Sequence, residues 1–153
     1  MSIQQRIQQS RYRNAAEESF VSILFTGSRI LQRLEDICAA HGITHTQYNV
    51  LRILRGVHPE GHPRCEIATR LITRAPDVTR ILDRLEQHKL IARTWSQENR
   101  RHSIARITPQ GLDLLRRIDP DIEALEQETT GRLTAAEQKT LVRLCDRMAC
   151  GEK

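Results

Sequence analysis

Polar and charged residues gather around one predicted helix whose opposite face is apolar. With the turn before it, this helix contributes Thr73, Arg74, Asp77, Thr79, Arg80 and Arg84. Arginine can donate two hydrogen bonds to guanine, and threonine can bond a base or contact a thymine methyl group. A polar segment further along contributes Arg100, Arg101 and His102, and arginine suits a narrow minor groove, where the potential is most negative. These residue types indicate contacts to duplex DNA.

The excess positive charge of the chain lies in the same region. Ten Lys or Arg and five Asp or Glu occur from Arg64 to Thr108, whereas the rest of the chain carries fourteen of each. The net charge of +5 therefore comes from one stretch. A localised basic surface attracts polyanions and steers their approach. The competing interpretation is an ordinary charged surface with an accidental bias.

Hydrophobic spacing and helix-end signals predict the elements before this region. A long helix from about Asn14 to His41 carries apolar residues three and four apart, which predicts one buried face. Its length suggests that it packs against a partner subunit. Thr44 to Gln47 fits a capping box that opens a second helix. Residues 58–63 contain two prolines and a glycine, which predicts a turn.

The next elements are two short helices, a hairpin and two further helices. Residues 64–72 predict a short helix, and a second one begins near Pro76, where the missing N–H is tolerated. The alternating runs Ile91–Ile107 around a polar tip predict a β-hairpin. Thr108 and Pro109 restart a helix that Pro120 should break or kink. A capping box at Thr134–Glu137 then opens a last helix, with Leu141, Leu144, Cys145 and Met148 expected inside.

The order helix, short helix, turn, helix, hairpin is typical of a winged helix-turn-helix. The expected fold class is therefore mainly α (α+β), with a two-stranded β wing after the recognition helix. In this geometry the second short helix enters the DNA major groove. Asp77 suits the positive end of that helix dipole as well as a base contact.

The residues from Ile43 to Gly111 resemble the multiple-antibiotic-resistance regulator (MarR) family. Thr46–Leu54 resembles the family's second helix, and Asp77–Glu86 resembles its recognition helix, the most specific part of the match. Asn99–Arg101 and Ile107–Gly111 resemble its wing and the start of the next helix. Two positions depart from the family pattern. Asn99 stands where Asp is usual, and Lys89 stands where glycine commonly ends the recognition helix.

The resemblance implies a domain plan and an assembly. Residues 1–42 would form an N-terminal dimerisation helix, 43–108 the DNA-binding lobe, and 109–153 the C-terminal dimerisation helices. It implies a transcriptional regulator, by default a repressor, that acts as a homodimer on a pseudo-palindromic operator. Half-sites would lie about one helical turn apart, roughly 34–36 Å.

The resemblance also implies an effector, a small aromatic or phenolic anion. Phe25, His45 and Tyr48 would line its crevice, unless they are core residues. One alternative is a DNA-binding protein without a ligand, and another is a redox-responsive regulator that uses Cys65. A third is a protein-interaction module that never binds DNA. For Arg84, the alternative to a DNA contact is a salt bridge with Asp83, Glu86 or a neighbouring helix. Arg93 could contact the DNA backbone or pack.

Other classes of function find no support in the sequence. It has no Gly-rich phosphate loop, Gly-x-Ser-x-Gly elbow or HExxH motif, so no catalytic residue, cofactor or metal site is expected. Cys38 and His41 have metal-ligand spacing, but core packing is the simpler interpretation. No segment has the roughly 20 consecutive apolar residues of a membrane span. A cytoplasmic location is therefore expected.

Overall fold

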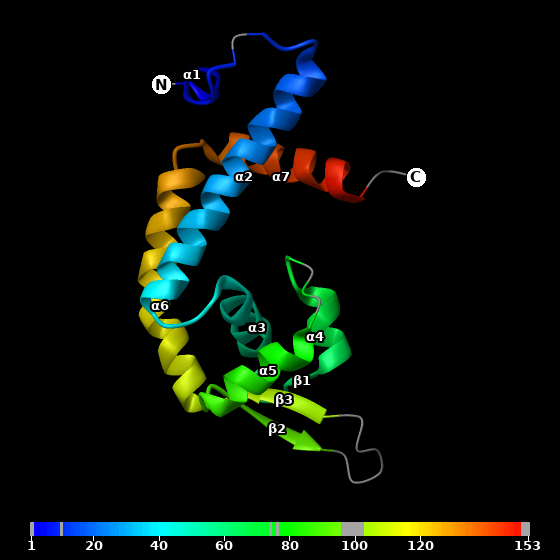
Figure 1. The fold of residues 1–153 in the computed structure, drawn as a ribbon, viewed down its shortest axis with the longest axis vertical. Helices are drawn as coiled ribbons and strands as arrows, with labels where there is room; N and C mark the ends of the chain where they lie inside the picture. The colour runs from blue at the N-terminus through cyan, green and yellow to red at the C-terminus, as the bar shows by residue number, and fades with distance from the viewer. Residues whose placement is uncertain (1, 10, 74, 76, 96–102, 151–153) are drawn as a thin grey trace. The chain divides into compact units, whose positions relative to one another are not determined.

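The computed structural model describes residues 2–9, 11–73, 75, 77–95 and 103–150 (Figure 1). Its elements are α1 (Ile3–Ile7), α2 (Ala15–Ala40), α3 (His45–Arg55), β1 (His62–Pro63), α4 (Arg64–Arg70), α5 (Val78–Gln87), β2 (Ile91–Trp95), β3 (Ser103–Ile107), α6 (Pro109–Thr129) and α7 (Ala135–Cys150). The chain forms two compact units, one from Met1–Leu31 with Asp121–Lys153 and the other from Gln32–Pro120. The mainly helical winged helix-turn-helix fold is confirmed.

Local side-chain hydrogen bonds determine where several helices begin. At α3 the Thr44 hydroxyl accepts a hydrogen bond from the Gln47 backbone N–H at 3.2 Å, while the Gln47 side chain accepts one from the Thr44 N–H at 2.9 Å. This reciprocal pair is the expected capping box, and it satisfies two backbone donors that the helix leaves unpaired. At α6 the Thr108 hydroxyl accepts from the Gly111 N–H at 3.1 Å, so threonine caps this helix too.

The wing sheet has three antiparallel strands in the order β1-β3-β2, so the expectation of two strands missed β1. β3 is central and pairs His62 with Ala105 on one side and Arg93 with Ala105 on the other. Gly61 precedes β1 with φ +80, and a Cβ there would lie 2.2 Å from the Ala105 carbonyl oxygen. Close approach of the backbone therefore requires glycine. A strand of two residues shows no alternation of side chains, so the sequence alone predicted a turn over residues 58–63.

The core of the Gln32–Pro120 unit joins the three helices to the sheet. α3 contacts α4, α5 and β3, and α5 also contacts β2. Fully buried side chains from these elements include Leu51, Leu54, Ile67, Leu82 and Leu85. Since about 25 cal/mol is gained for each Å² of apolar surface removed from water, this burial holds α5 against the sheet.

α6 is continuous through Pro120, so of the expected break or kink the break is wrong. Proline removes one backbone hydrogen bond from a helix interior. Apolar side chains on both sides of it are buried, with Ile118 at 0% and Leu125 at 6% exposure. Burial of residues before and after the proline favours continuing the helix over ending it.

The apolar faces of α2 and α7 are largely exposed in this single chain, and the expectation that α2 packs against a partner subunit stays a prediction. Leu24 is 56% exposed, Leu31 42%, Leu144 43% and Met148 57%, and Cys38 is the buried residue of α2. Periodicity predicts that a helix has an apolar face, but it does not say which molecule covers that face. Within the described residues, no helix combines the length and apolar character required to cross a membrane.

Candidate nucleic-acid interface

The side chain of Asp77 determines where α5 begins. Its carboxylate accepts a hydrogen bond from the Arg80 backbone N–H at 3.0 Å, which makes Asp77 the N-cap. A capping carboxylate also faces the positive end of the helix dipole. Asp77 therefore caps α5 and faces its dipole, which is the structural alternative to a base contact that the sequence indicated.

α5 separates its apolar and polar side chains onto opposite faces. Val78, Leu82 and Leu85 are buried. The exposed face carries Thr79, Arg80 and Arg84, three of the predicted contact residues. Arg80 and Arg84 are four residues apart, so they lie on the same side of the helix.

The turn between α4 and α5 is held by α3. The Asn49 side-chain oxygen accepts a hydrogen bond from the Ile72 N–H at 3.0 Å. Thr73, the next residue, is exposed. The predicted contact residues Arg74, Arg100, Arg101 and His102 lie outside the described residues, so their roles stay predictions.

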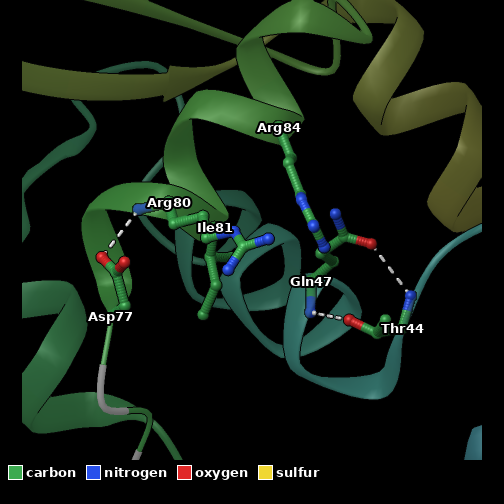
Figure 2. Close-up of a pocket in the computed structure, with 6 residues that line it drawn as sticks. All are labelled: Thr44, Gln47, Asp77, Arg80, Ile81 and Arg84. Atoms are coloured by element: carbon green, nitrogen blue, oxygen red, sulfur yellow. Dashed lines mark hydrogen bonds between the residues drawn. The ribbon is translucent and has the colours of Figure 1, made fainter.

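A hollow of about 280 Å³ lies between α5 and the start of α3 (Figure 2). Its lining residues are Thr44, Gln47, Asp77, Arg80, Ile81 and Arg84. Figure 2 shows the two arginine side chains extending from α5 toward the capping residues of α3. Guanidinium groups in this position can donate to phosphate or base acceptors. Sequence reasoning did not place Thr44, Gln47 and Ile81 here; the capping box was the only available signal.

Several arginines of this unit form ion pairs, whereas Arg80 and Arg84 form none with the residues that the structure describes. Arg55 binds both oxygens of Asp119 at 2.8 and 3.0 Å, and Arg70 pairs with Glu66 at 3.5 Å. Among the residues that the structure describes, Arg80 and Arg84 form no ion pair. The salt bridge considered for Arg84 is not formed, because Asp83 and Glu86 are both engaged by Arg93.

Arg93 is a packed residue. Its side chain is 11% exposed, and its Nη2 atom lies 2.7 Å from Asp83 and 2.5 Å from Glu86. The hydrogen bond to Glu86 is the main reason that the pKa of Arg93 is raised above its ordinary value. Of the two interpretations offered for this residue, packing is the one the structure favours.

The residues considered for an effector or a redox switch lie in different settings. His45 and Tyr48 are both on α3, whereas Phe25 is on α2 in the other unit. Glu35 contacts the Nδ1 atom of His45 and also accepts from its backbone N–H at 3.3 Å. Tyr48 is 4% exposed, and burial raises the pKa of its hydroxyl. The effector role of these residues stays a prediction.

Two cysteines of the Gln32–Pro120 unit differ sharply in accessibility. Cys65 is exposed near the start of α4. Cys38 is fully buried, and burial, with a smaller contribution from the Glu35 carboxylate, raises the pKa of its thiol to about 11. Core packing of Cys38 is therefore favoured, and the role of Cys65 stays a prediction.

Comparisons with known proteins agree with this geometry. The MarR family model matches residues 43–103. The HTH-type transcriptional regulator MhqR of Bacillus subtilis is 30% identical over 113 residues, which is 74% of this chain and 77% of that protein. A MarR transcription factor from Planctomyces limnophilus is 36% identical with a TM-score of 0.70, and the match covers 89% of this chain and 98% of that one.

A third relative was solved with nucleic acid. Sco3205, a MarR family transcriptional regulator from Streptomyces coelicolor in complex with DNA, is 25% identical with a TM-score of 0.80; the match covers 93% of this chain and 91% of that one. The fold, the cationic face of α5 and these relatives together show that the chain belongs to the MarR family of DNA-binding winged helix-turn-helix transcriptional regulators.

Proposed function

We propose that this protein is a homodimeric transcriptional repressor that places α5 of each subunit in the major groove of a pseudo-palindromic operator. The observation that carries the proposal is the pair of arginines on the exposed face of α5, Arg80 and Arg84. Within the described part of the chain neither forms an ion pair, while Arg55, Arg70 and Arg93 all do. Unpaired guanidinium groups can release counterions and contact DNA without first breaking a salt bridge.

The homodimer is supported by the apolar side chains exposed on the Met1–Leu31 and Asp121–Lys153 unit. On α2 these are Phe20, Ile23, Leu24 and Leu31, and on α7 they are Leu141, Val142, Leu144 and Met148. An open hollow of about 380 Å³ on α7 is lined partly by Leu133, Leu141 and Leu144. Large exposed apolar faces mark protein contacts, and a second copy of the chain would offer the same faces in return under two-fold symmetry.

Selection of bound duplexes from a random pool tests the proposed function. The expected result is an enriched sequence with two inverted half-sites whose centres lie roughly 34–36 Å apart. A variant with Leu24→Lys and Val142→Lys should sediment as a monomer and lose most of its operator affinity. Failure of the parent to bind any duplex at low salt would contradict the proposal, as would a monomeric parent.

A small aromatic or phenolic effector completes the proposal. Its support is the Nε2 atom of His45, which is buried and has no hydrogen-bond partner. A buried polar atom without a partner is costly, and a ligand hydroxyl or carboxylate would satisfy it. Titration of the operator complex with phenolic acids should release the DNA if an effector exists. A regulator without a ligand would keep its affinity. As a regulator of transcription the protein would act in the cytoplasm.

A further inference from the structure

Arg93 binds two acidic side chains of α5, although it lies on β2 and not on the exposed face of α5. Its Nε and Nη2 atoms lie 2.9 and 2.5 Å from one Glu86 oxygen, and its backbone N–H donates to the other at 3.0 Å. The same Nη2 atom lies 2.7 Å from Asp83. One guanidinium therefore binds both carboxylates of α5.

Each carboxylate also has a basic residue three positions away along the chain. Asp83 lies three residues after Arg80, and Glu86 lies three residues before Lys89. Side chains three apart on a helix are neighbours and can form ion pairs, so Arg80 can reach Asp83. Lys89 follows the end of α5 at Gln87 and has a positive φ of 59. Within the described residues, neither Arg80 nor Lys89 has an ion-pair partner. The carboxylates bind the guanidinium of the neighbouring strand instead.

Geometry explains why Arg93 is the preferred partner. Its side chain is 11% exposed, whereas those of Asp83 and Glu86 are 47% and 37% exposed. A partly buried guanidinium held by its strand loses less freedom on pairing than an exposed side chain, and water weakens its ion pairs less. Arg93 thus binds both carboxylates, and Arg80 and Lys89 remain available.

We propose that Arg93 is a positioning residue of the DNA-binding surface: by binding Asp83 and Glu86 it keeps these carboxylates away from Arg80 and Lys89. The inference rests on the proposed DNA-binding function. Without Arg93, the two carboxylates would pair with Arg80 or Lys89 or repel the phosphates. The strand that begins the wing would then determine how much positive charge the recognition helix presents.

Two variants that break the same ion pairs separate this role from simple anchoring of β2. One is Arg93→Gln, and the other is the double variant Asp83→Asn/Glu86→Gln. Binding to the duplex selected from the random pool, and to an unrelated duplex of about 30 base pairs, is measured over a range of salt. Circular dichroism confirms that each variant is folded.

If Arg93 keeps the two carboxylates away from Arg80 and Lys89, the two variants should give opposite results. Arg93→Gln should weaken binding about tenfold or more and lower the salt dependence, because Arg80 and Lys89 become neutralised. The double variant should bind at least as tightly as the parent, and adding both changes to Arg93→Gln should restore most of the affinity. An equal loss in both variants, or no rescue in the triple variant, would overturn the inference. A parent that binds neither duplex would instead remove the proposed function, and this inference with it.

Discussion

Replacing Arg84 with Gln tests whether the guanidinium of Arg84, which forms no ion pair in the described part of the chain, contacts a DNA phosphate. Each phosphate contact contributes about 0.9 to the slope of log K against log salt. In the proposed homodimer the substitution counts twice, so the slope should fall by about 1.8. Between 50 and 200 mM salt, a fourfold change, the parent should therefore lose about twelvefold more affinity than the variant.

Arg55→Gln is the matched control. It removes the same charge from the same unit, but Arg55 binds both oxygens of Asp119 at 2.8 and 3.0 Å and is not available to DNA. The Arg55 and Asp119 side chains are 37% and 33% exposed, so solvent screening limits the loss of stability to about 1 kcal/mol or less. Its salt slope should match that of the parent.

The assay is fluorescence anisotropy of a labelled duplex, titrated with each protein at several salt concentrations. A lower slope of log K against log salt for Arg84→Gln than for Arg55→Gln supports the inference that arginines without an ion pair contact the DNA. If Arg84→Gln and Arg55→Gln lower the slope equally, net charge controls binding and the reasoning from ion pairs is wrong. An unchanged slope in Arg84→Gln would show that its guanidinium contacts no phosphate.

Three further predictions concern stability and reactivity. Asp77→Ala removes the capping hydrogen bond of α5 and should cost about 1 kcal/mol in urea unfolding; Asp77→Asn keeps an acceptor, and an equal cost there would rule out the cap as the cause. Leu51→Ala opens a cavity at a fully buried site and should cost about 2–5 kcal/mol, whereas Ile72→Ala, at 80% exposure, should cost almost nothing. Comparable losses would contradict the assigned core. Because burial raises the pKa of Cys38 from 9.0 to about 11, its thiolate at pH 8 should be about a hundredfold rarer than that of an ordinary thiol, and a thiol reagent should label it only after unfolding. The contribution of this group to stability is full below its ordinary pKa and is lost as pH rises through about 11; rapid labelling of native Cys38 would refute the assignment.

Local signals explain why most elements could be predicted. The capping box at Thr44 and Gln47 and the cap at Thr108 use side chains within three residues of the groups they bind. Lys89 adopts φ 59, the left-handed conformation expected where glycine commonly ends this helix. The polar face of α5 also follows from spacing alone. Contacts this close along the chain are encoded in the order of residue types.

Contacts between distant segments account for the errors. β1 exists because β3 pairs with it, and α6 continues past Pro120 because residues on both sides are buried. The sequence showed that α2 and α7 have apolar faces, but it could not show that one chain leaves them exposed.

The sequence by itself determined the class of protein and predicted which residues contact DNA, because the type and spacing of side chains define the helix, its cap and its charged face. Only the tertiary structure decided which cations stay available. Asp83 and Glu86 have Arg80 and Lys89 nearby along the chain, and the sequence alone does not distinguish these from Arg93 as partners. The packing of β2 beside α5 brings one partly buried guanidinium to both carboxylates. Arg93 pairs with Asp83 and Glu86 because it is close to them in space, not because it is close along the chain.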